Sequence, residues 1–297
     1  MRWTFLIILT AWISSCSHSP DNNINMNAAE TKELKADSIS GYAPVNGLNM
    51  YYEIHGSGMP LVLIHGGGST IQTTFGRVLH LFAKTHKVIA VELQAHGHTA
   101  DIDRPLSFQQ DADDVAELLK HLHISKADVF GFSNGASTTL ELAIRHPEIV
   151  NKIVVASTMY KKEGSYPWFW DMMKHATFEE MPKPLKDAYL KINPDSNALY
   201  TMFKRDVARM QSFQDINSSD LKAIQAPAFI ITGNNDVVSP EHAVEMYRLL
   251  PHARLAILPG VHGEYMGEIT TPQNQEFIKG TVAMIEQFLV EPMHEKK

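Results

Sequence analysis

A serine with a glycine two positions before it and another two positions after it is the residue of this sequence that most clearly indicates catalytic chemistry. Residues 131–135 read Gly-Phe-Ser-Asn-Gly, between an apolar run at 127–132 and a segment with helical periodicity at 136–146. A strand, a tight turn and a helix in this order are what a nucleophile elbow requires, because glycine-sized neighbours let strand and helix pack closely around a strained serine. The context predicts that Ser133 is a nucleophile. The motif is short, and an ordinary strand-to-helix turn is the alternative interpretation.

A serine hydroxyl is not nucleophilic alone and needs a neutral histidine to take its proton. The chain has 15 histidines, so position must select the base. His262 lies in the loop 259–263, Pro-Gly-Val-His-Gly, just past the last predicted strand and after Ser133 in chain order. We therefore predict that His262 is the general base, against the alternative of a solvated surface-loop histidine.

The imidazole in turn needs a carboxylate that fixes its tautomer and stabilises its cation. Asp236 follows a predicted strand in Thr-Gly-Asn-Asn-Asp, residues 232–236, and precedes a helix that begins at Ser239-Pro240. Asp236 is the predicted partner of His262, although this loop also suits an Asx turn. Glu264 is the weaker rival, because it lies only two residues from His262.

Acyl transfer also needs backbone N–H groups aimed at the developing oxyanion. The run His-Gly-Gly-Gly at 65–68 directly follows a predicted strand, and its main chain is free of bulky side chains. We assign the oxyanion hole to the N–H groups of Gly67 and Asn134. A phosphate-binding loop is the alternative, but neither G-x-x-x-x-G-K-[ST] nor G-x-G-x-x-G spacing occurs there.

Alternating strands and helices position these residues, as in a mostly parallel sheet. A first hairpin is predicted to turn at Asn46-Gly47, and Ser107 with Gln110 forms a predicted capping box. The predicted strands span 42–45, 48–55, 61–65, 87–91, 127–132, 152–156, 228–232 and 254–258, and the predicted helices span 75–84, 109–122, 136–146 and 275–289.

The alternation stops at residues 158–225, which we interpret as a helical insertion. This segment is rich in aromatic residues and methionine, and Pro182, Pro184 and Pro194 punctuate it. Most of these aromatics are expected to anchor a small separate core. Together, a cap of this composition over a serine also predicts an apolar pocket.

Taken together, these motifs resemble the α/β-hydrolase family. The order Ser133, Asp236, His262 and the loop at 65–68 carry the resemblance, which extends over about residues 41–290. It implies an α/β fold with an eight-stranded, mostly parallel sheet flanked by helices and a helical cap inserted after the sixth strand. It also implies hydrolysis of esters or related acyl compounds through an acyl-enzyme.

Residues 94–99 resemble the family's Gly-His-Gly-x-Ser/Thr loop, with Ala95 in place of the usual glycine. By this resemblance His96 has a structural role beside the elbow. The same histidine, with His98 and Asp101, also suggests a metal site, but the spacing does not match H-x-H-x-D-H, and metal catalysis is disfavoured. Asn134 departs from the bulkier or apolar residue of many relatives, which leaves the acyl-group preference open.

The N-terminus predicts export and lipid anchoring. An apolar stretch at 3–13 follows Arg2 and is too short to span a bilayer, as in a signal peptide. It ends at Ile-Ser-Ser-Cys, which resembles a bacterial lipobox and implies acylation of Cys16, the single cysteine. A plain secretory signal is the alternative. The predicted organisation is a signal peptide at 1–15, a lipidated flexible tether at 16–40, a hydrolase core at 41–157 and 226–293, and a cap at 158–225.

Composition narrows the function further. The chain of 297 residues is 44% hydrophobic and 20% charged, with a net charge of −7, and no basic stripe stands out for nucleic acid. We predict a lipid-anchored serine hydrolase of the bacterial cell envelope, without cofactor or metal, that cleaves small carboxylic esters with an apolar acyl or aromatic group. Lactonase, carbon–carbon bond hydrolase, acyltransferase, perhydrolase and a non-catalytic binding protein on the same fold are the alternatives. The oligomeric state is left open.

Overall fold

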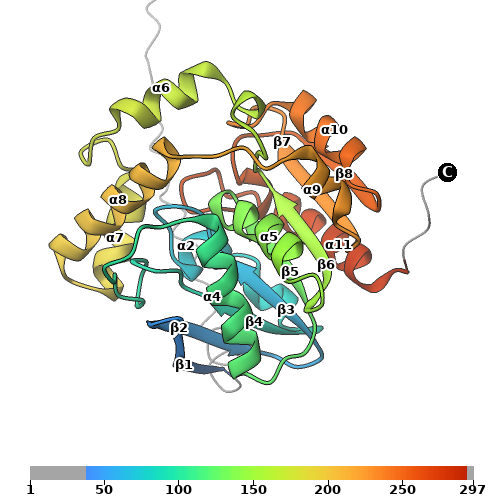
Figure 1. Cartoon of the computed structure of the whole chain (residues 1–297), viewed down its shortest axis with the longest axis horizontal. Helices are drawn as coiled ribbons and strands as arrows, with labels where there is room; N and C mark the ends of the chain where they lie inside the picture. Colours follow the sequence, from blue (N-terminus) through green and yellow to red (C-terminus); the bar gives the residue numbers. More distant parts are fainter. Residues whose placement is uncertain (1–37, 293–297) are drawn as a thin grey trace, which may run out of the picture. The chain divides into compact units, whose positions relative to one another are not determined.

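A single eight-stranded sheet organises the described part of the chain, residues 38–292 of a computed structural model. The predicted signal peptide, Cys16 and nearly all of the predicted tether lie outside these residues. The strand order is β1-β2-β4-β3-β5-β6-β7-β8 (Figure 1). The strands are β1 (Ile39–Val45), β2 (Leu48–His55), β3 (Met59–Ile64), β4 (His86–Val91), β5 (Ala127–Phe132), β6 (Val150–Ala156), β7 (Ala228–Gly233) and β8 (Ala253–Leu258).

Only the first two strands break the parallel order. β1 pairs antiparallel with β2, and β2 pairs antiparallel with β4, whereas all the other neighbours are parallel. Asn46 and Gly47 join β1 to β2 with φ angles of 48° and 84°, the left-handed conformations that a tight hairpin turn needs. The predicted mostly parallel, eight-stranded sheet is therefore confirmed.

Helices cover both faces of the sheet. Along β3, Val62 and Ile64 pack into a core cluster with α4, α5 and α10, while Leu61 and Leu63 pack into a second cluster with α2, α3 and α11. This burial on both faces explains why the parallel strands read as continuous apolar runs. The flanking helices are α2 (Ile71–Phe75), α3 (Leu79–Phe82), α4 (Phe108–His121), α5 (Asn134–Arg145), α10 (Pro240–Leu249) and α11 (Gln275–Val290).

The single helix predicted at 75–84 is wrong, because two short helices, α2 and α3, occupy this region. Thr70 caps α2 through a reciprocal hydrogen-bond pair with Thr73, so the first helix begins before the predicted start. Gly76 forms its C-cap, and α3 begins only after Val78. Apolar periodicity alone did not reveal this interruption.

The insertion between β6 and β7 is helical, as predicted. It contains η1 (Lys162–Gly164), α6 (Pro167–His175), α7 (Lys183–Ile192), α8 (Ser196–Gln211) and α9 (Ser218–Ala223). Figure 1 shows α6, α7 and α8 along one side of the described unit, beyond the sheet. Its aromatic and methionine side chains form two small apolar clusters, one around Phe169 and Phe213 and one around Tyr189 and Met202. Within residues 38–292, no helix has the length and apolarity needed to cross a membrane.

Candidate active site

Ser133 occupies a strained turn between β5 and α5. Its φ and ψ angles are 53° and −120°, a conformation that side-chain-bearing residues rarely adopt. The Ser133 N–H donates to the carbonyl of Ala156 at 2.8 Å, which ties the turn to the end of β6. A non-glycine residue held in this conformation by its surroundings is an observation that points to a functional position.

The two glycines of the motif are required by backbone contacts. A Cβ atom on Gly131 would lie 2.1 Å from the carbonyl oxygen of Gly135, and one on Gly135 would lie 2.1 Å from the carbonyl oxygen of Ile64. Real Cβ atoms do not approach oxygen so closely, and both obstacles are backbone. The spacing of small residues in 131–135 is thus a packing requirement of the turn that presents Ser133.

Asp236 and His262 meet at the carboxyl ends of β7 and β8. The Asp236 Oδ1 atom lies 2.6 Å from His262 Nδ1. The Asp236 carboxylate is fully buried, whereas 29% of the His262 side chain is exposed. Because Nδ1 faces a carboxylate acceptor, it carries the proton, and Nε2 is left as the basic nitrogen of the neutral ring.

The Asp236 carboxylate is held by more than the imidazole. Its Oδ2 atom accepts a hydrogen bond from the Ser157 hydroxyl and others from the Thr232 hydroxyl and Gly233 N–H, both at 3.2 Å. Burial alone would raise the pKa of Asp236, but His262, the Ser157 hydroxyl and the Gly233 N–H outweigh it and lower the pKa to about 2. Asp236 is therefore a carboxylate anion at neutral pH.

Charge on Asp236 also acts on the imidazole. Burial disfavours the imidazolium, yet the Asp236 charge and hydrogen bond, with a further contribution from Glu268, raise the pKa of His262 above its ordinary value. The His262 ring packs against the Phe132 ring with a centroid distance of 4.7 Å. Phe132 directly precedes Ser133, so this contact holds the imidazole beside the turn.

Ser133 and His262 line the same cavity, whose volume is about 300 Å³. Within the described residues, no direct hydrogen bond joins the Ser133 hydroxyl to the imidazole. Such bonds are often long in ligand-free sites and shorten when substrate binds. Cap residues supply most of the apolar wall, which includes Phe169, Met172, Met173, Met210 and Phe213.

The predicted oxyanion residues lie against each other beside Ser133. A Cβ atom on Gly67 would lie 2.3 Å from Asn134 Nδ2, and one on Gly66 would lie 3.4 Å from Ser133 Cβ. Among residues 38–292, the backbone N–H groups of Gly67 and Asn134 have no hydrogen-bond acceptor. Gly67 and Asn134 line the same cavity as Ser133, so both N–H groups are available to a ligand bound there.

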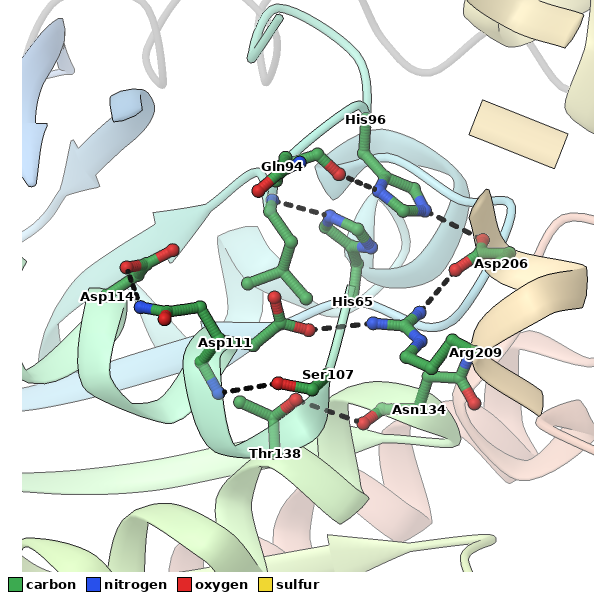
Figure 2. A network of polar contacts seen from close by, with 12 residues as sticks. His65, Gln94, His96, Ser107, Asp111, Asp114, Asn134, Thr138, Asp206 and Arg209 are labelled. Atoms are coloured by element: carbon green, nitrogen blue, oxygen red, sulfur yellow. Dashed lines mark hydrogen bonds and ion pairs between the residues drawn. The ribbon is translucent and has the colours of Figure 1, made fainter. Parts of the chain in front are cut away.

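A buried network of charges links the cap residues Asp206 and Arg209 to His96 and Asp111 (Figure 2). Asp206 of α8 accepts the Gly68 N–H with Oδ2, and the same oxygen lies 2.9 Å from His96 Nε2. Arg209, one helical turn later, pairs with Asp206 and with Asp111 of α4, the latter at 2.7 Å. One cap helix is therefore linked to the loop after β3, the loop after β4 and helix α4.

His96 is a cation in this network. Its Nδ1 atom lies 2.8 Å from the Gln94 carbonyl oxygen and its Nε2 atom faces Asp206, so both ring nitrogens meet acceptors and both carry protons (Figure 2). Burial opposes this charge, but Asp206 outweighs burial and raises the pKa of His96. Its neighbour His65 is neutral, because burial lowers its pKa to about 3.

The other two residues of the possible metal motif have separate partners. His98 Nδ1 lies 2.8 Å from Glu92, and Asp101 accepts hydrogen bonds from Gln94 and Arg205. Together with the His96–Asp206 pair, these contacts direct the three side chains to three different carboxylate or cation partners.

Sequence reasoning missed several polar residues around the site. Ser157 follows β6 at a φ of 52° and orients Asp236, and Glu268 lines the cavity. Asp206 and Arg209 lie in the predicted cap, for which the sequence analysis considered the aromatic and methionine residues and not the charged ones. Their spacing of three on a cap helix was a possible signal, because it puts both on one helical face.

Fold and site together define an α/β hydrolase. Residues 61–266 match the family model described as Alpha/beta hydrolase family, which is more than half of the chain. The chain therefore belongs to the alpha/beta hydrolase family.

Proteins similar to this chain are named for different hydrolytic activities. The chain is 29% identical over 248 residues to human serine hydrolase BPHL, covering 76% of this chain and 81% of that protein. It is 24% identical over 289 residues to 2-hydroxy-6-oxo-6-(2'-aminophenyl)hexa-2,4-dienoic acid hydrolase of Metapseudomonas resinovorans, covering 88% and 96%. The enol-lactonase structure from Burkholderia xenovorans LB400 has a TM-score of 0.65 at 21% identity, covering 84% and 100%, and shows likeness of fold.

Proposed function

We propose that the chain is a serine hydrolase that cleaves carboxylic esters through an acyl-enzyme. Ser133 attacks the ester carbonyl, His262 takes the serine proton and returns it to the leaving alcohol, and Asp236 orients the imidazole and stabilises its cation. The Gly67 and Asn134 N–H groups bind the oxyanion. Water then attacks the acyl-enzyme with the same base.

One observation carries this proposal. The Asp236–His262 pair joins a buried carboxylate to an imidazole at 2.6 Å, and His262 lines the cavity that also contains Ser133 on its strained turn. A structural ion pair would not require a serine at a φ of 53° in the same cavity. The two unused backbone N–H groups beside Ser133 supply the remaining element of acyl transfer.

Labelling with a fluorophosphonate probe tests the nucleophile. We expect one adduct, located on Ser133 by peptide mass spectrometry, and none in Ser133→Ala. Ser137→Ala is the matched control, because Ser137 lines the same cavity but its hydroxyl is hydrogen-bonded to Thr158 at 2.7 Å. Folded protein that is not labelled and turns over no p-nitrophenyl ester, lactone or amide would refute the proposal and favour a binding protein.

The pH dependence of kcat/KM follows from His262. Only the neutral imidazole accepts the serine proton, and Asp236 raises the pKa of His262 above its ordinary value. We expect activity on a neutral ester to fall as the pH decreases, with a midpoint above about 6.5. A profile from pH 5 to 9 measures this limb, and a midpoint well below 6.5 would contradict the assigned base.

Charge in the cavity favours esters over the dienoic acids for which the M. resinovorans relative is named. Such substrates carry a carboxylate. Among the described residues that line the cavity, none is lysine or arginine, and Glu268 is an acid. A carboxylate-bearing substrate would thus meet no cation beside Ser133.

We further propose that the chain is lipid-anchored in the bacterial cell envelope through Cys16. The support is the apolar stretch at 3–13 followed by Ile-Ser-Ser-Cys, which lies outside the described residues. Mass spectrometry of the mature protein from membranes should find an acylated N-terminal Cys16. An unmodified Cys16 in a chain with an intact N-terminus would count against the anchor.

A further inference from the structure

Glu268 is the one carboxylate among the described residues that line the cavity beside Ser133. His262 is the other titratable group of the lining, and no lysine or arginine contributes to it. The Glu268 residue is only 5% exposed. A buried acid at a cavity wall is costly to ionise unless a ligand or a neighbour compensates it.

Backbone geometry builds Glu268 into this position. Gly263 and Gly267 have φ angles of 77° and 72°, and these left-handed residues fold the chain back around η2 (Glu264–Met266). The Glu268 N–H donates to the Gly263 carbonyl at 3.2 Å. A Cβ atom on Gly263 would lie 2.8 Å from Glu268 Cβ and 2.7 Å from the Phe132 ring, so only glycine permits this packing.

The Glu268 carboxylate is fixed on one side. Its Oε2 atom accepts the Thr270 N–H at 2.8 Å and the Thr270 hydroxyl. Within residues 38–292, both hydrogen bonds to the Glu268 side chain go to Oε2, and no lysine or arginine forms a salt bridge with the group. Thr270 thus orients the carboxylate, whose charge has no permanent cationic partner, because the His262 ring that also acts on it is charged only when protonated.

Proximity to His262 decides which part of a substrate meets Glu268. The imidazole returns its proton to the leaving-group oxygen, so the leaving group must lie beside the ring. Glu268 lines the same cavity as this ring, and its Cβ would lie 2.8 Å from a Cβ atom on Gly263, the residue after His262. The apolar cap side chains Phe169, Met210 and Phe213 line the same cavity and suit an acyl chain.

We propose that Glu268 is a specificity-determining residue that binds a cationic leaving group, so that the preferred substrates are esters of apolar acids with amino alcohols. This inference rests on the proposed ester hydrolysis at Ser133. An ammonium group of the leaving alcohol supplies the permanent counter-ion that Glu268 lacks, and a carboxylate at the same place is repelled. The bond cleaved is the ester bond in either case, and the amino alcohol leaves with the proton from His262.

Three esters of butyric acid test the proposal. Butyrylcholine carries the cation, 3,3-dimethylbutyl butyrate is its neutral isostere, and the butyrate ester of 3-hydroxypropanoic acid carries an anion. At pH 8 and low salt, we expect kcat/KM of the cationic ester to exceed that of the neutral one by about tenfold, and the anionic ester to be about tenfold slower than the neutral one.

Glu268→Gln should bring the cationic-to-neutral ratio close to one, because the amide keeps the Thr270 contacts but loses the charge. Glu264→Gln is the matched control, since Glu264 lies on the same loop, binds the Val261 N–H at 2.9 Å and does not line the cavity. Its ratio should equal that of the wild type. An equal fall for all three esters in Glu268→Gln would show an effect through His262 alone and overturn the proposal.

Inhibition of the wild-type protein provides a further test of the role of Glu268 that needs no variant. Tetramethylammonium should compete with the neutral ester at least about tenfold more strongly than tert-butanol does. Equal inhibition by both compounds, or equal kcat/KM values for the cationic and neutral esters in the wild type, refutes the role of Glu268. Ester hydrolysis at Ser133 is still supported in that case if the protein turns over esters and Ser133 is labelled. Absence of all turnover and labelling refutes the proposed function instead.

Discussion

Asp236→Asn is expected to lower kcat for a neutral ester by about 10⁴-fold at pH 8. The amide presents an N–H group or a weaker acceptor to His262 Nδ1, which stabilises the wrong tautomer and no longer stabilises the imidazolium. KM should change little, because the buried Asp236 side chain does not line the cavity. Steady-state kinetics on p-nitrophenyl butyrate measure the effect.

Glu264→Gln is the matched control for this prediction. Glu264 is the other carboxylate close to His262 in sequence, but it accepts the Val261 N–H at 2.9 Å and not the imidazole proton. Its replacement should change kcat by less than about threefold, as expected for a side chain outside the reacting groups. The reverse order of effects, with Glu264→Gln the more damaging, would reassign the orienting carboxylate.

Most of the site followed from local sequence because its residues stand next to strand ends. Ser133, Asp236 and His262 each lie within a few residues of the carboxyl end of β5, β7 or β8, and parallel strands bring these ends to one edge. Apolar runs buried on both faces marked the strands. The residues that the structure brings together could therefore be predicted without knowing the packing.

The contacts that sequence could not predict depend on the cap. Asp206 meets His96 across 110 positions, and Arg209 meets Asp111 across 98. Nothing local fixes where a helix of the insertion docks on the core. The same limitation applies to Glu268, whose position depends on two left-handed glycines whose φ angles only the folded loop reveals.

Arg209→Met is expected to lower the free energy of unfolding by about 3–5 kcal/mol. The Arg209 side chain is 2% exposed, and its loss leaves the carboxylates of Asp111 and Asp206 buried without their shared counter-ion. Urea unfolding followed by circular dichroism gives the change. Lys183→Met is the matched control on cap helix α7, because the Lys183–Asp187 pair is 80% and 58% exposed and should contribute less than about 1 kcal/mol. Comparable small losses in both variants would show that the network does not hold the cap.

A double variant distinguishes the loss of the Arg209–Asp111 ion pair from the cost of leaving the Asp111 carboxylate buried without a counter-ion. In Arg209→Met combined with Asp111→Asn, the remaining charges are Asp206 and His96, which neutralise each other at hydrogen-bond distance. Burial already raises the pKa of Asp111 to about 6, so its charged form is the one that most depends on Arg209. The double variant should therefore be more stable than the sum of the two single losses predicts, by about 1–3 kcal/mol. Strict additivity would mean that Asp111 and Arg209 stabilise the cap independently, and the network would then not be the unit that holds α8 over the glycine loop.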